Sequence, residues 1–223
     1  TMNFMNKNNK ADYIETGVWA KKAFQEAKRY GNARVIASSA DKSYSYIPKV
    51  TKEDIDPEAD YVYYCMNNTI YGTKYPYIPD TGDVPLIADI SSCFLSEPID
   101  VTKFAVLYGG AQKNIAPAGL TVVIVREDML GNAMDITPTM FNYKIHADND
   151  SLYNTPPCFT IYMCKLVLEW IRDMGGLEAI KENNIKKAKL LYDETEVNNV
   201  TIRTKENGTY EGTIQAPLYK DIP

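Results

Sequence analysis

The 223-residue sequence contains a single histidine, His146, and this scarcity limits the chemistry open to the chain. A metal site built from several histidines and an acid–base pair of two histidines are both excluded for this chain alone. The 24 Lys and Arg residues do not outnumber the 29 Asp and Glu residues, so the net charge is −5. Nucleic-acid-binding proteins usually carry a basic face, so the sequence predicts no nucleic-acid partner. It predicts no metal site either, because histidine is so scarce.

The sequence also lacks long hydrophobic runs and paired cysteines. Its longest apolar stretch, at residues 120–125, has the length of a strand and is too short to span a membrane. The first thirty residues carry lysines and no continuous apolar core, so no signal peptide is indicated. The cysteines form neither a CxxC pair nor a zinc pattern: they are Cys65, Cys93, Cys158 and Cys164. We therefore expect free thiols and a cytoplasmic protein without membrane contact.

The hydrophobic (45%) and charged (24%) fractions are ordinary for a globular protein with a substantial core. The periodicity of the hydrophobic residues, together with the Gly and Pro residues that interrupt it, predicts the secondary structure. Strands are expected at 11–16, 33–38, 61–65, 85–90, 104–108 and 120–125, and helices at 18–30, 155–174 and 177–192. Runs such as VYYC and LTVVIV are almost entirely apolar, which is typical of strands buried on both faces. The sequence predicts an α/β fold, and Asn207-Gly208 predicts a β-hairpin near the C-terminus.

Residues 109–119 join two strongly hydrophobic strands and place a lone lysine, Lys113, among small residues. Small residues let the backbone approach a ligand closely, and loops at strand ends are where α/β folds place their sites. Desolvation beside apolar strands lowers the pKa of a lysine, which makes its amine a nucleophile for a carbonyl. An ordinary turn lysine explains the same pattern, and no GxxxxGK[ST] phosphate loop is present.

Two further polar residues follow predicted strands. Asp89 ends the strand PLIAD, and Thr69 comes shortly after the strand VYYC. A carboxylate at a buried strand end is costly unless a cation meets it, and a protonated pyridine nitrogen is such a cation. A lysine, an aspartate and a hydroxyl at successive strand ends match what pyridoxal phosphate requires for attachment, ring protonation and ring orientation. Taken singly, Asp89 and Thr69 are also explained by structural roles.

Longer motifs around these residues resemble the phosphoserine aminotransferase family, a class-V, fold-type-I group of pyridoxal-phosphate enzymes. The motifs are YGGAQKNIAPAGLTVVIVRED at 108–128, ADYIETGVWAKKAFQEAKRYG at 11–31, DYVYYCMNNTIYGT at 60–73, IADISSCFLSEPIDVTKF at 87–104 and SLYNTPPCFTIYMCKLVLEWI at 151–171. The resemblance implies a three-layer α/β/α large domain with a mostly parallel sheet, incomplete here, over residues 1–197. Residues 198–223 would be a divergent β-rich tail or the start of a small domain.

The resemblance also implies a role for individual residues. Lys113 would attach the cofactor and move a proton between the substrate Cα and the cofactor C4′. Asp89 would pair with the pyridine nitrogen, and Trp19 would stack on the ring. The other assignments are Thr69 on the ring hydroxyl side, Gln112 on the cofactor phosphate, and Asn154 and Thr155 on the phosphate in the neighbouring subunit. These last two imply a homodimer with shared sites.

The implied reaction transfers an amino group from glutamate to 3-phosphohydroxypyruvate, which gives O-phosphoserine and 2-oxoglutarate in serine biosynthesis. The family's N-terminal phosphate loop with its substrate-binding His and Arg, and its C-terminal domain with a further Arg, have no counterpart in these 223 residues. Asn68 stands where many members carry Glu, and Ala116 where many carry Gly. We therefore keep two alternatives: a catalytically inactive domain that binds or dimerises, and another class-V enzyme such as a cysteine desulfurase. Gln112 and Trp19 count against the second, because desulfurases usually have His at both places.

Overall fold

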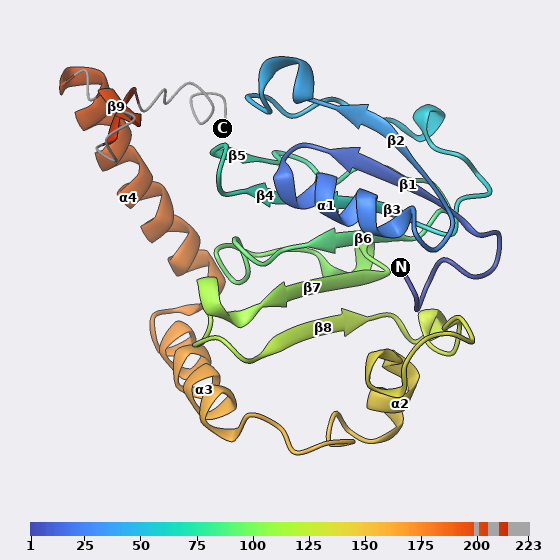
Figure 1. Cartoon of the computed structure of the whole chain (residues 1–223). Helices are drawn as coiled ribbons and strands as arrows, with labels where there is room; N and C mark the ends of the chain where they lie inside the picture. The colour runs from blue at the N-terminus through green and yellow to red at the C-terminus, as the bar shows by residue number, and fades with distance from the viewer. Residues whose placement is uncertain (199–200, 205–209, 214–223) are drawn as a thin grey trace.

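A six-stranded sheet forms the centre of the protein in the computed structural model, which describes residues 1–198, 201–204 and 210–213, with side chains through residue 190. Figure 1 shows the sheet with its strands in the order β2-β1-β3-β6-β7-β8. Neighbours from β2 to β7 are parallel, and β8 is antiparallel to β7, which confirms the predicted, mostly parallel α/β sheet. The strands are β1 (Lys10–Glu15), β2 (Asn32–Ser38), β3 (Val62–Cys65), β6 (Leu86–Asp89), β7 (Val106–Gly110) and β8 (Thr121–Val125).

The parallel register brings the carboxyl ends of the central strands side by side. Cys65 of β3 is paired with Asp89 of β6, and Asp89 is paired with Tyr108 of β7. Backbone hydrogen bonds extend this register, from Met66 N to the Asp89 oxygen (2.9 Å) and from Ile90 N to the Tyr108 oxygen (2.9 Å). Ligand sites of α/β folds lie at this edge, where four of the predicted site residues end or follow these strands: Thr69, Asp89, Gln112 and Lys113.

Each face of the sheet has its own hydrophobic core, because side chains alternate between the faces along every strand. On one face, α1 (Val18–Ala27) packs its buried Ala20 against a layer that includes Tyr63 of β3. On the other face, Leu107 lies beneath long connecting segments, with Cys164 of the long helix at one end of the same core. The central strands are therefore covered on both faces, as their apolar composition indicates.

The long helix α3 (Cys158–Asp173) begins three residues after the predicted N-cap, Thr155. The two prolines explain this difference. A residue that precedes proline is disfavoured in the helical region, so Thr155 and Pro156 both stay outside the helix. Pro157 takes the N-cap position instead.

Strand β8 differs from the expectation of a strand buried on both faces. All five of its residues are half-buried or exposed, and Ile124 is 42% exposed. Among the described strands β8 pairs only with β7, so it forms an edge of the sheet. An apolar run gives the same signal in a central strand and at an edge, because it records composition and not neighbours.

The predicted break after α3 is confirmed. Gly175 and Gly176 have φ values of 101° and 84°, conformations that favour glycine, and α4 (Gly176–Asn198) follows directly. The strands of the predicted hairpin pair antiparallel as β9 (Thr201–Thr204) and β10 (Tyr210–Thr213), while the Asn207-Gly208 turn lies outside the described residues. Across the described residues, every helix is too short or too polar to cross a membrane.

Three short elements have no counterpart in the sequence pattern. They are β4 (Asn67–Asn68), β5 (Thr73–Lys74) and the six-residue helix α2 (Tyr143–Asp148). Elements of this length are too short to show a period of 2 or 3.6 residues. The β4–β5 hairpin matters for the site, because Thr69 lies in its turn.

Candidate functional site

Lys113 ends a short 3-10 turn (Ala111–Lys113) that follows β7 directly. Its Nζ is 5.8 Å from the centroid of the Trp19 ring, and Trp19 comes from the first turn of α1. The lysine side chain is exposed, so the described residues do not supply the desolvation expected of its amine. None of the ion pairs within the described part of the chain involves Lys113, and its amine is therefore open to a ligand.

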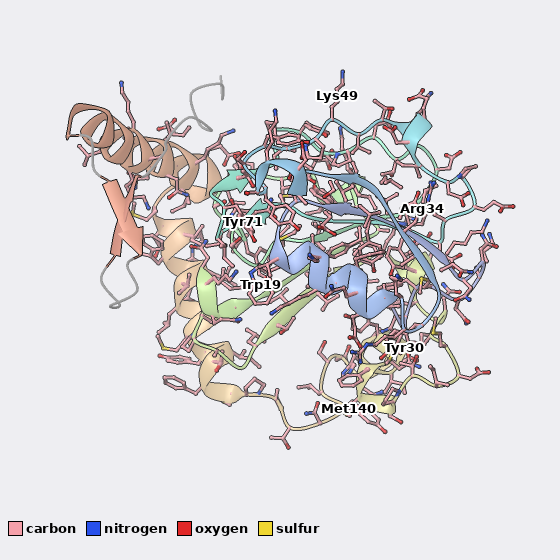
Figure 2. The ribbon with its side chains drawn as sticks, turned by 45° about the horizontal axis from the view of Figure 1, so that its top comes forward. Trp19, Tyr30, Arg34, Lys49, Tyr71 and Met140 are labelled. Carbon is pink, nitrogen blue, oxygen red and sulfur yellow. The ribbon has the colours of Figure 1, made fainter. Side chains whose placement is uncertain are left out.

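The Trp19 ring offers a flat apolar surface next to positive charge. It is 45% exposed, and Lys22 Nζ also lies over it, 5.0 Å from the ring centroid. Figure 2 shows Trp19 near the start of α1, at the same end of the sheet as Tyr71. An exposed aromatic face flanked by ammonium groups suits a planar ligand that carries negative charge.

Asp89 is half-buried at the end of β6, where its carboxylate is held in one orientation. Its Oδ1 accepts a hydrogen bond from Ser91 N at 2.9 Å, and no donor among the described residues reaches Oδ2. The Ser91 hydroxyl accepts from Gly110 N at 3.2 Å, which ties Asp89 to the turn that carries Lys113. The free Oδ2 is therefore available to a cationic hydrogen-bond donor of a ligand.

The buried thiol of Cys65 and the half-buried thiol of Cys93 both lie within the electrostatic influence of Asp89 and Lys113. Burial raises the pKa of the Cys65 thiol, Asp89 raises it further, and Lys113 lowers it. Burial raises the pKa of Cys93 to about 12, and Asp89 and Lys113 again act in opposite directions. Burial also raises the pKa of Tyr108, with Asp89 as the next cause. Asp89 and Lys113 therefore belong to one electrostatic cluster at the carboxyl edge of the sheet.

The Gln112 side chain is exposed and folds back over Gly110. A Cβ atom on Gly110 would lie 2.6 Å from Gln112 Oε1 and 3.0 Å from Nε2, so glycine leaves the space that the amide occupies. The amide Nε2 is a hydrogen-bond donor next to Lys113 in the chain. This turn therefore carries an amine and an amide donor on consecutive residues.

Thr69 is exposed in the β4–β5 turn, and no contact among the described residues joins it to Lys113 or Asp89. Its link to the site runs through its neighbour Asn68, whose Oδ1 accepts from Thr16 at the end of β1. Sequence reasoning missed Asn68 and Ser91 as site residues. The sequence carries a weak signal for Ser91, because the side chain of an Asp at a strand end often accepts a hydrogen bond from the backbone amide two residues later, as in an Asx turn. No local pattern indicates Asn68.

Asn154 and Thr155 lie away from this cluster. Both are exposed, in the segment that leads into α3, and Figure 1 shows this segment at the outside of the molecule, beyond β8. The described structure does not bring them to Lys113 of the same chain. Their assignment to the site of a neighbouring subunit stays a prediction.

The family model "Aminotransferase class-V" matches residues 1–217. The chain belongs to the class-V aminotransferase family. Relatives of this chain include the phosphoserine aminotransferase of Nitrosomonas europaea, 50% identical over 204 residues, which are 88% of this chain and 55% of the relative. A phosphoserine aminotransferase of Bacillus cereus is 52% identical over 192 residues, 86% of this chain and 53% of the relative. The chain thus spans about half the length of the relatives it matches.

Solved structures agree with this family. Phosphoserine aminotransferase from Bacillus circulans subsp. alkalophilus matches with a TM-score of 0.85 and 43% identity, covering 93% of this chain and 58% of that chain. A PLP-bound phosphoserine aminotransferase from Trichomonas vaginalis matches with a TM-score of 0.79 and 34% identity, covering 95% and 59%. The family expected from the sequence motifs is confirmed.

Replacement of Gly17, the N-cap of α1, is expected to destabilise the protein more than replacement of Gly110. A Cβ at Gly17 would lie 2.9 Å from Asn68 Oδ1 and 3.1 Å from the Tyr71 ring, whereas at Gly110 it meets the flexible end of Gln112. We expect Gly17→Ala to lower the free energy of unfolding by about 1–3 kcal/mol and Gly110→Ala by less than about 1 kcal/mol. Urea denaturation measures both, and equal losses would contradict close packing at Gly17.

Proposed function

We propose that the chain binds pyridoxal phosphate and belongs to a transaminase that moves an amino group from glutamate to 3-phosphohydroxypyruvate. The products are O-phosphoserine and 2-oxoglutarate, for serine biosynthesis. The observation that carries the proposal is the cluster of Lys113, Asp89 and Trp19 at the carboxyl edge of the sheet. About 50% identity to two phosphoserine aminotransferases supports the choice of substrates.

The residues present fit the chemical groups of this cofactor. Its aldehyde needs a primary amine, and Lys113 is exposed and outside the ion pairs of the described residues. Its protonated ring nitrogen needs a carboxylate oxygen, and Oδ2 of Asp89 has no donor among the described residues. Its ring needs a flat apolar surface, which the exposed Trp19 face offers. Its phosphate needs hydrogen-bond donors, and the Gln112 amide lies beside Lys113.

When bound, pyridoxal phosphate supplies an electron sink for the breaking of the Cα–H bond of an amino acid. The negative charge of Asp89 favours a proton on the ring nitrogen, and the Ser91 amide keeps this carboxylate in place. The amine Nζ of Lys113 acts as the general base and acid that takes up and returns the proton at the substrate Cα. Trp19 covers one face of the ring and excludes water from it.

We further propose a homodimer with shared sites. Thr69 approaches the ring hydroxyl side within its own subunit, which is compatible with its exposed place next to the buried Asn68. Asn154 and Thr155 reach the phosphate in the partner subunit, which is compatible with their exposed place just ahead of α3. Phosphate groups are bound well at the starts of helices.

The domain division and the compartment are also proposals. Residues 1–197 form the cofactor-binding large domain, and residues 198–223 form a divergent tail or the start of a small domain. Support comes from the two cores, which join the strands of the large sheet and α1 and reach Cys164 of α3. We place the protein in the cytoplasm, because its four cysteines are free thiols, as in a reducing compartment.

Lys113→Ala is expected to abolish the visible absorption band that the protein gains with pyridoxal phosphate, because the amine that attaches the cofactor is gone. Lys49→Ala is the control, since Lys49 is an exposed lysine in the segment between β2 and β3, outside the proposed site. We expect this control to keep the band. Visible absorption and circular dichroism of the purified variants give the comparison, and a band that persists in Lys113→Ala would exclude the lysine assignment.

Asp89→Asn is expected to reduce phosphoserine formation from glutamate and 3-phosphohydroxypyruvate, because an amide cannot hold the ring nitrogen protonated. We expect activity to fall at least about tenfold, because a decrease of even one unit in the pKa of the ring nitrogen lowers the protonated fraction by up to about tenfold. The exposed Asp83→Asn serves as control and should keep full activity.

Cofactor binding without turnover in the unmodified protein would favour an inactive binding domain. Release of sulfide from cysteine would favour a desulfurase.

A further inference from the structure

Asn68 is a buried amide at the junction between β1 and the β4–β5 hairpin, and it is 3% exposed. Its Oδ1 accepts a hydrogen bond from Thr16 Oγ1 at 3.2 Å, and its Nδ2 donates to Thr73 Oγ1 at 3.1 Å. Thr16 is 0% exposed and Thr73 is 1% exposed, so water does not compete for these groups. A buried amide that is satisfied at both ends fixes the segments that it joins.

The backbone of Asn68 closes the turn that follows it. Its carbonyl oxygen accepts hydrogen bonds from Tyr71 N at 3.1 Å and from Gly72 N at 2.9 Å. Thr69, the next residue, is exposed on this turn. The side chain of Asn68 therefore binds β1, while its backbone shapes the segment that presents Thr69.

Thr16, the partner of Asn68 at the end of β1, is connected through the backbone to Trp19. Thr16 is followed by Gly17, the N-cap of α1, and Trp19 lies two residues further, in the first turn. Gly17 touches the hairpin closely, because a Cβ there would lie 2.9 Å from Asn68 Oδ1. A shift of Asn68 therefore moves the start of α1 relative to the turn, and Trp19 with it.

Tyr71 holds the junction from outside. Its ring lies next to Gly17 and packs on Tyr44, with ring centroids 4.8 Å apart. The Tyr44 hydroxyl donates to Glu15 Oε1 at 2.6 Å, and Glu15 is the last residue of β1. Figure 2 shows Tyr71 and Trp19 at the same end of the sheet. The hairpin turn is therefore fixed to the end of β1 on two sides.

We propose that Asn68 is a positioning residue for the cofactor, because its clamp on Thr16 and Thr73 sets the spacing between Trp19 and Thr69. These two residues are assigned to the ring face and the ring hydroxyl side. The identity of the ligand rests on the proposed function, whereas the clamp is a property of this chain alone. Asn68 itself touches no reacting atom and acts through its neighbours.

Binding of pyridoxal phosphate to a variant series tests this role. Thr73→Val removes the acceptor of Asn68 Nδ2 at nearly constant shape, and Thr73→Ser keeps the hydroxyl. The loss of one buried hydrogen bond is worth about fivefold in an equilibrium constant. We expect the dissociation constant to rise about tenfold in Asn68→Ala and about fivefold in Thr73→Val, and to change less than about twofold in Thr73→Ser.

Thr81→Val is the matched control, because Thr81 is also buried and its Oγ1 donates to the Val84 oxygen at 2.7 Å, outside the clamp. It should lower the melting temperature and leave cofactor binding unchanged. A second readout needs no cofactor: fluorescence of Trp19 in a Trp170→Phe background, which leaves one tryptophan. Acrylamide quenching of Trp19 should increase in Asn68→Ala and Thr73→Val, but not in Thr81→Val.

The positioning role stands if affinity and quenching both change in the two clamp variants and not in the Thr81 control. Wild-type values of either quantity in Asn68→Ala and Thr73→Val, or an equal loss of affinity in Thr81→Val, would overturn it. If the unmodified protein bound no pyridoxal phosphate, the proposed function would fail. The quenching series would then decide the clamp on its own.

Discussion

The register of β3, β6 and β7 is the constraint on which the site depends. Pairing of Cys65 with Asp89, and of Asp89 with Tyr108, makes the three strands end together. Ile87 and Asp89 alternate with Ala88 along β6, so Asp89 points to the sheet face that α1 covers. A slip of one residue would turn Asp89 to the opposite core, away from Trp19 on α1. Site chemistry therefore follows from sheet pairing before any ligand is bound.

Burial around this edge further disfavours charge on two neighbouring groups. It raises the pKa values of the Cys65 thiol and the Tyr108 hydroxyl above their ordinary values, and Asp89 adds to both effects. Both groups therefore stay neutral at physiological pH, and in the proposed site Asp89 is the carboxylate that a ligand cation would meet. Lys113 stands at the exposed side of the same cluster, where an incoming aldehyde can reach it. Neutral buried neighbours and one accessible amine suit a site that must separate one positive from one negative charge.

The sequence predicts the parts of the fold that have strong local signals. Apolar runs indicated the central strands, and small residues around Lys113 with Asp89 at a strand end indicated a site edge. Residues such as Trp19 and Gln112 entered only through the family resemblance, because a helical Trp and an exposed Gln have many ordinary explanations. The apolar run of β8 predicts a strand buried on both faces, but composition does not reveal that the strand lies at an edge of the sheet. The Asn68 clamp had no local signal, since Thr16 and Asn68 are 52 positions apart and meet only in the folded sheet.

The central claim is that Lys113 is the reactive amine of a pyridoxal-phosphate site at this edge of the sheet. Peptide mapping after borohydride reduction tests this claim most directly. The protein is mixed with the cofactor, reduced, digested and analysed by mass spectrometry. We predict that the label is found on the peptide that contains Lys113 and nowhere else in significant amount. A label on Lys22, or one spread over surface lysines with Lys113 unmodified, would contradict the claim.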